Sequence, residues 1–120
     1  MPHLTLEYSS NLASLGVNET LQALNQALAG CGQFEEADIK SRAQAFEHCV
    51  VGIAPQGRAF AHIKLAILSG RSAEAKLALS QLLLQTLEQC LPPSPGLNVQ
   101  LCAEILEIDR ASYSKSVIAG

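Results

Sequence analysis

Charged residues are scarce in this chain of 120 residues: Asp, Glu, Lys and Arg make up 16% of it, against about 25% in typical soluble domains. With so little charge to solvate its surface, we expect the protein to bury part of that surface in an oligomer. A basic excess is also missing, because 8 Lys and Arg residues face 11 Asp and Glu residues, for a net charge of −3. This balance argues against nucleic acid or an anionic membrane as a partner, since both require a basic face.

Long apolar runs are absent as well. The richest apolar stretch, residues 77–91, is interrupted by polar residues such as Gln81 and Glu88, whereas a membrane span needs about 20 mostly apolar residues. The opening MPHLTLEYSSN has neither the basic nor the apolar region of a signal peptide, so we expect a cytoplasmic protein. The length suits one domain over residues 1–120, with a core at 2–108 and a short tail at 109–120.

The chain has four cysteines but no C-x-x-C motif; they are Cys31, Cys49, Cys90 and Cys102. We interpret them as small buried side chains in a reducing cytoplasm. No histidine lies at ligand spacing from a cysteine. We therefore expect no metal and no other cofactor.

Hydrophobic periodicity predicts the order β-α-β-β-α-β. Strands are predicted over 3–8, 39–51, 59–68 and 97–108, where apolar and polar residues alternate or apolar residues dominate. Helices are predicted after the potential N-caps Asn18 and Ser72, the first running towards Gly30 and the second to about Leu91, before the prolines. The chain thus divides into two βαβ halves, which we expect a hairpin to join.

The second predicted helix has two apolar stripes. Leu79, Leu83 and Leu87 form one, and Leu77, Leu84 and Leu91 form the other, roughly 140–160° away around a helix of about 3.6 residues per turn. A single sheet covers only one stripe. We expect a second apolar surface, such as another subunit, to cover the other.

The predicted topology brings polar residues together at one edge of the sheet. A βαβ crossover makes the first two strands parallel, and the third strand then runs back to the edge where they begin. Pro2, Lys40, Arg42 and the segment Gly70-Arg71-Ser72 therefore converge there. The last segment also lies at a helix N-terminus, which favours anions. This edge is a candidate carboxylate site.

Pro2 gives this edge a candidate base. Removal of Met1 would leave Pro2 with a free secondary amine, whose ordinary pKa is near 8. Burial and neighbouring cations lower that pKa, because both disfavour the charged amine. The product would be a general base that is partly neutral near pH 7. If Met1 is retained, the Pro2 nitrogen is an amide and cannot act as a base.

Four segments resemble the 5-carboxymethyl-2-hydroxymuconate isomerase family of the tautomerase superfamily. They are MPHLTLEYSSN at the start, I-K-S-R at 39–42, F-A-H-I-K-L at 60–65 and L-S-G-R-S at 68–72, in the same order as in the family. The resemblance extends over residues 2 to about 107. It implies a tautomerase-like α+β fold, in which the two βαβ halves form a four-stranded mixed sheet with two helices on one face. It also implies a homotrimer and catalysis by an amino-terminal proline.

Carried over by position, the resemblance implies that Pro2 is the catalytic base and that Arg71 binds a substrate carboxylate. Lys40 stands where relatives usually have a second arginine. Lysine keeps the charge but lacks the planar fork that grips a carboxylate with two hydrogen bonds. A different substrate or weaker binding would follow from this departure.

Two further candidate substrate-binding residues allow two interpretations each. His62 shares a strand face with Phe60 and Lys64, so it either has a structural or interface role or lines the pocket. Arg42 either contacts substrate or pairs with a carboxylate such as Glu7 or Glu104, and we favour the carboxylate.

The resemblance implies a cofactor-independent isomerase that moves a proton on an unsaturated oxo- or hydroxy-polycarboxylate. The family's usual setting, bacterial homoprotocatechuate breakdown, makes 5-carboxymethyl-2-hydroxymuconate the leading substrate. The alternative is a non-enzymatic, trimeric module that binds small acids, since ferredoxin-like regulatory domains share the same element order. A trimer with an interaction role and a vestigial pocket is a third possibility.

Overall fold

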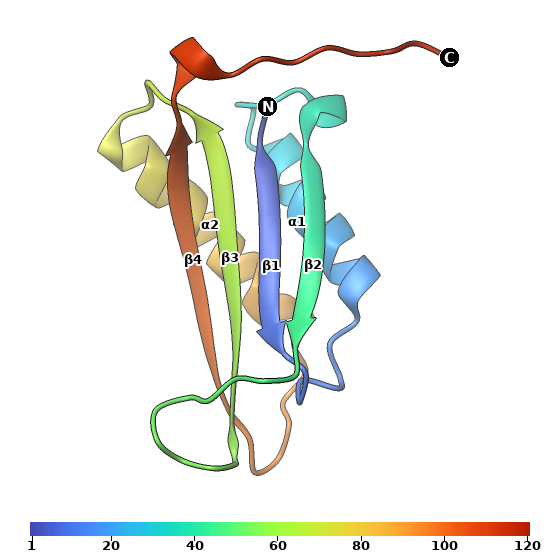
Figure 1. Cartoon of the computed structure of the whole chain (residues 1–120), viewed down its shortest axis with the longest axis vertical. Helices are drawn as coiled ribbons and strands as arrows, with labels where there is room; N and C mark the ends of the chain where they lie inside the picture. The colour runs from blue at the N-terminus through green and yellow to red at the C-terminus, as the bar shows by residue number, and fades with distance from the viewer.

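The computed structural model describes residues 1–120 as a four-stranded sheet with both helices on one face (Figure 1). The strands are β1 (His3–Ser9), β2 (Lys40–Phe46), β3 (Arg58–Leu68) and β4 (Asn98–Ile108). The helices are α1 (Val17–Gly30) and α2 (Ala73–Cys90), with 3-10 turns η1 (Glu36–Asp38) and η2 (Arg110–Ser112). The predicted element order is confirmed. Neither helix combines the length and the apolarity that crossing a membrane requires.

The sheet order is β2-β1-β3-β4, with β1 parallel to β2, antiparallel to β3, and β3 parallel to β4. The expected hairpin between the second and third strands is wrong, because β1 lies between them. The predicted strand over 39–51 is too long. The last register pair of β2 joins Phe46 to Ser9, and beyond it the edge strand has no partner, so the chain leaves the sheet.

The core lies between the sheet and the two helices. Alternate strand residues face the helices and are fully buried, among them Leu6 on β1 and Ile63 on β3. From α2 the stripe Leu79, Leu83 and Leu87 enters this core, as predicted. In the second stripe Leu77 is exposed, and Leu84 and Leu91 are half-buried. The surface expected to cover that stripe stays a prediction.

The predicted helix caps had mixed outcomes. Ser72 caps α2, and its hydroxyl accepts a hydrogen bond from the Ala75 amide at 3.1 Å. Asn18 does not cap α1, which begins at Val17 with Gly16 as the N-cap residue. The Thr20 hydroxyl instead donates to the Gly16 carbonyl at 2.6 Å.

The expectation that all four cysteines are buried is wrong. Cys49 lies exposed in the loop before β3, and Cys102 is exposed on the sheet face that no helix covers. Cys31 and Cys90 are half-buried, and all four thiols are free. Side chains alternate between the two faces of the sheet along β4, so Cys102 lies on the open face while its neighbours face the helices.

Leu83→Ala should lower the free energy of unfolding by about 2–5 kcal/mol, because it leaves a cavity in the fully buried core. Ile53→Ala is the matched control, since Ile53 is 99% exposed and surface changes shift stability by about 0.5 kcal/mol or less. Urea unfolding measures both. Equal losses in the two variants would contradict this description of the core.

Candidate active site

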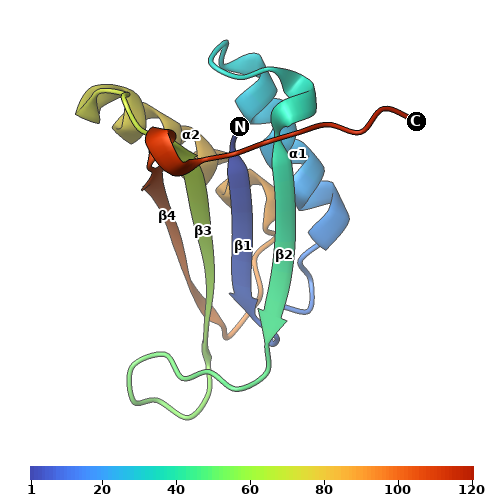
Figure 2. The same ribbon diagram turned by 45° about the horizontal axis from the view of Figure 1, so that its top comes forward.

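The sheet topology gathers both chain termini at one end of the molecule. β1 and β2 begin there and β3 and β4 end there, while α2 starts beside them and the C-terminal tail crosses the same end (Figures 1 and 2). Lys40 is the register partner of His3, and its amide donates to the Pro2 carbonyl at 3.1 Å. The predicted convergence of strand ends is therefore confirmed.

Pro2 is fully buried directly below the chain's amino group. The Met1 amine lies 3.7 Å from Asp38 Oδ2. Burial lowers the pKa of this amine; the Asp38 carboxylate opposes the shift, and the Lys40 and Lys115 cations add to it. With Met1 in place, the Pro2 nitrogen is part of a peptide bond. Removal of Met1 would leave Pro2 with a free secondary amine, directly before β1.

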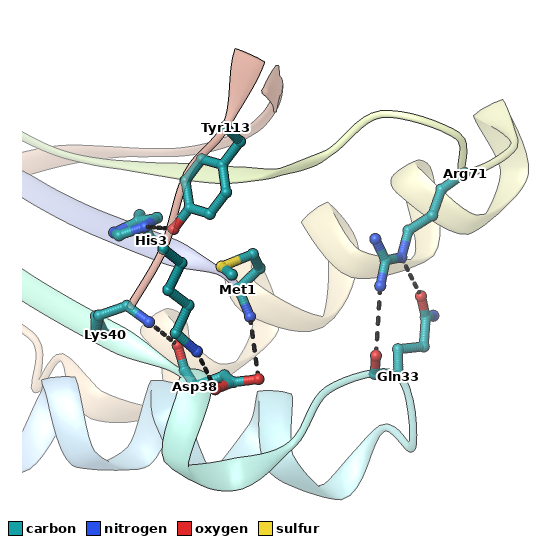
Figure 3. A network of polar contacts seen from close by, with 8 residues as sticks. Met1, His3, Gln33, Asp38, Lys40, Arg71 and Tyr113 are labelled. Carbon is teal, nitrogen blue, oxygen red and sulfur yellow. Dashed lines mark hydrogen bonds and ion pairs between the residues drawn. The ribbon is translucent and has the colours of Figure 1, made fainter. Parts of the chain in front are cut away.

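A pocket of about 560 Å³ opens beside the amino terminus. Its walls include His3 and Lys40 from the starts of β1 and β2, Asp38 from η1, and Tyr113 and Lys115 from the tail. Figure 3 shows His3 beside Tyr113, and Lys40 beside Asp38. The two lysines outnumber the one aspartate, so the side chains give the pocket a net positive charge at neutral pH.

Asp38 connects the cations of this pocket. Lys115 Nζ donates to Asp38 Oδ1 at 2.6 Å, and Lys40 Nζ donates to the Asp38 carbonyl at 2.5 Å. The hydrogen bond from Lys115 is the main reason why the pKa of Asp38 is lowered. The carboxylate therefore stays ionised near neutral pH and holds Lys115 over the pocket.

His3 is held between Arg42 and Tyr113. Arg42 Nη2 lies 3.1 Å from His3 Nδ1, and Tyr113 Oη lies 2.9 Å from His3 Nε2. A guanidinium group only donates, so Nδ1 accepts from Arg42 and the proton of the neutral ring is on Nε2, which donates to Tyr113. Burial, Lys40 and Arg42 all lower the pKa of His3, which keeps the ring neutral.

Arg71 lies apart from the pocket. Its Nε donates to Gln33 Oε1 at 2.9 Å, its Nη2 donates to the Gln33 carbonyl at 3.3 Å, and its guanidinium lies 4.7 Å from the centre of the Phe34 ring. In Figure 3, Arg71 and Gln33 lie on one side of Met1, and Asp38 and Lys40 lie on the other. Lys40 lines the pocket itself, whereas Arg71 lies between β3 and α2 and is not among the residues that line it.

The predicted pairing of Arg42 with Glu7 or Glu104 is wrong. Glu7 Oε1 instead lies 3.2 Å from Lys64 Nζ, and Glu104 Oε2 lies 2.5 Å from His62 Nε2. Both carboxylates thus pair with other side chains on the open face of the sheet, and Arg42 forms its hydrogen bond with His3 instead. His62 lies outside the pocket, and its pairing with Glu104 fits the structural interpretation.

Among the charged and aromatic residues that line the pocket, sequence analysis missed Asp38, Tyr113 and Lys115. Asp38 gave no motif signal, although it lies two residues before Lys40. Tyr113 and Lys115 lie in the segment that was expected to be a plain tail. No group of three His, Cys, Asp or Glu side chains is placed to hold a metal ion.

A family model described as 5-carboxymethyl-2-hydroxymuconate isomerase matches residues 2–119. The chain belongs to this family. A crystal structure of a 5-carboxymethyl-2-hydroxymuconate isomerase from Deinococcus radiodurans R1 is 32% identical, with a TM-score of 0.87 over 96% of this chain and 88% of that one. No curated protein matches the chain.

More distant structures share the fold of this isomerase family. A 5-carboxymethyl-2-hydroxymuconate delta-isomerase is 22% identical, with a TM-score of 0.82 over 98% of this chain and 88% of its own. A "Q0 fused 4-OT wild type symmetric trimer" is 20% identical, with a TM-score of 0.76 over 95% and 91% of the two chains. The tautomerase-like α+β fold and the isomerase family of this chain are thus confirmed.

The lowered pKa of His3 makes the stability of the protein depend on pH. The unfolded chain, with an ordinary histidine pKa of 6.5, binds the proton more readily than the folded chain. Stability is therefore full above that value and falls as the pH decreases through it. Urea unfolding between about pH 7.5 and about pH 5.5 should show a loss that is smaller in the His3→Gln variant.

The control for this experiment is His48→Gln, because His48 lies exposed in the loop before β3. This variant shows how much the pH dependence of stability changes when an exposed histidine is removed. An unchanged pH dependence in His3→Gln would show that another group is responsible.

Proposed function

We propose that this isomerase-family protein moves a proton on an unsaturated oxo- or hydroxy-polycarboxylate such as 5-carboxymethyl-2-hydroxymuconate. One observation carries the proposal: Pro2, where the family match begins, is fully buried beside a pocket with an excess of lysine. No cofactor is needed, because the proton that the base removes is returned to the same conjugated system.

The proposed base is the amine of Pro2 after removal of Met1. The amine accepts a proton from the enol hydroxyl, or from a carbon next to the carbonyl, and returns it further along the conjugated system. The causes that lower the pKa of the Met1 amine, namely burial, Lys40 and Lys115, act in the same direction on an amine one residue further on. They raise the neutral, basic fraction near pH 7.

In this proposal the cations bind the carboxylates and stabilise the negative charge that develops on the dienolate. Lys40 acts from inside the pocket, and Arg71 reaches the substrate from the turn before α2. Arg71 must exchange its bonds to Gln33, which is exposed, for bonds to a carboxylate. Charge-assisted bidentate bonds favour that exchange.

We propose that the protein assembles as a homotrimer. The structural relative described as a symmetric trimer supports this assembly. The face of the sheet away from the helices also lacks a cover and exposes Leu106. Such a face would be buried if several sheets packed around a common axis.

The alternative is a trimeric module that binds small acids and performs no reaction. Retention of Met1 in the cell would favour it, because the Pro2 nitrogen would then be an amide and the terminal amine would be that of Met1, 3.7 Å from Asp38 Oδ2. The two functions differ in a single testable property, the state of the amino terminus.

Two forms of the chain that differ only by Met1 separate these functions. The form that starts at Pro2 should isomerise 5-carboxymethyl-2-hydroxymuconate, and the form that retains Met1 should be slower by about 10² or more, since it has lost its base. Intact mass spectrometry establishes the terminus, and ultraviolet absorbance follows the reaction. Equal turnover by both forms would exclude Pro2 as the base.

Arg71→Ala should raise the KM for this substrate by about 10-fold to 100-fold, because hydrogen bonds between charged groups contribute about 1.5–3 kcal/mol. Arg58→Ala is the control: Arg58 is exposed at the opposite end of β3, where it donates to the Val51 carbonyl. Steady-state kinetics on the form that starts at Pro2 give both values. An unchanged KM in Arg71→Ala would remove Arg71 from the substrate site.

A further inference from the structure

The C-terminal tail is anchored beside the end of β3 before it reaches the pocket, and a local hydrogen bond begins η2. Arg110 donates through Nη2 to the Ser69 carbonyl at 3.0 Å, and the Asp109 carboxylate accepts from the Ala111 amide at 3.2 Å at the start of η2. Tyr113 then packs edge-on against the His3 ring, with ring centres 6.1 Å apart, and shares a hydrogen bond with it. These contacts direct the next residues over the start of β1 and β2.

Lys115 follows directly and points its ammonium group at Asp38, 2.6 Å from Oδ1. Its side chain is about one-third exposed, at 30%, and lines the same pocket as Lys40. An ammonium group has three donors, and the structure uses one of them on Asp38. Two donors therefore face the pocket and the solvent.

We infer that Lys115 is a substrate-binding residue that takes one carboxylate of a polycarboxylate and so selects for its third acidic group. This inference rests on the proposed function, because it names which feature of the substrate the tail recognises. Lys40 and Arg71 account for two carboxylates. The carboxylate of the carboxymethyl arm is the third, and it binds Lys115.

The role of Asp38 is to position this cation. Its lowered pKa keeps the carboxylate ionised, so Lys115 is already in place before the substrate arrives. The aspartate compensates only one of the pocket's two lysines, which leaves the net positive charge that an incoming anion requires. Asp38 is therefore a positioning residue, since its carboxylate would repel the substrate rather than bind it.

Lys115→Met keeps most of the side chain's length and removes its charge. In the form that starts at Pro2, it should raise the KM for 5-carboxymethyl-2-hydroxymuconate by about tenfold, the equivalent of one lost contact of about 1.4 kcal/mol, with kcat largely kept. The KM for 2-hydroxymuconate, which lacks the carboxymethyl arm, should not change. Lys115→Arg should restore the tricarboxylate KM.

Lys76→Met is the matched control, because Lys76 also forms an ion pair, 3.5 Å from Glu107, but does not line the pocket. It should leave both KM values unchanged. An equal effect of Lys115→Met on both substrates, or no effect on either, would overturn the inference.

A second measurement separates this inference from the proposed function. Calorimetry with propane-1,2,3-tricarboxylate and with glutarate measures binding without turnover. Loss of the preference for the tricarboxylate in Lys115→Met, but not in Lys76→Met, supports the inference even if the protein isomerises no substrate. An unchanged preference overturns it, whatever the kinetics show.

Discussion

The pairing of β1 on both sides is the constraint on which the candidate site depends. An amino-terminal strand at the edge of a sheet frays easily, but β1 is hydrogen-bonded to β2 on one side and to β3 on the other. The Pro2 carbonyl is already held by the Lys40 amide. β1 is therefore paired on both sides from its first residue, directly after the proline whose amine is the proposed base.

Asp38 adds an electrostatic constraint at the same place. Its two carboxylate oxygens face the amino terminus and the tail, because Oδ2 lies near the Met1 amine and Oδ1 accepts from Lys115. One side chain thus connects the two ends of a chain of 120 residues. The tail packs over the amino terminus, so the pocket depends on residues that are more than 100 positions apart.

Much of the fold could be predicted from the sequence. Apolar residues alternate in residues 59–68 with the period of a strand, and alternate residues of β3 are buried in the structure. The leucines at 79, 83 and 87 repeat with the period of a helix, and all three are buried on one face of α2. The end of β2 could not be predicted, because it depends on where its neighbour β1 stops. The expected hairpin was wrong for a related reason: periodicity does not indicate which strands are neighbours.

The site was only partly predictable. Lys40 and Pro2 meet because parallel strands begin at one edge, which topology alone implies. The partner of Arg42 was misjudged, because Lys64 and His62 compete for the two carboxylates that were expected to bind it. The tail residues Tyr113 and Lys115 carry no periodic signal, and only the folded chain shows which surface they cover.

On the proposed mechanism, the charge of the pocket and the strength of the base depend on each other. Burial and the lysines lower the pKa of the Met1 amine, and on this mechanism they act in the same direction on the Pro2 amine, which without substrate is then ready to accept a proton. A bound polycarboxylate supplies negative charge beside the same amine and favours its protonated form. The anion therefore strengthens the base that it needs, and the effect is greatest when every carboxylate is held close to the amino terminus.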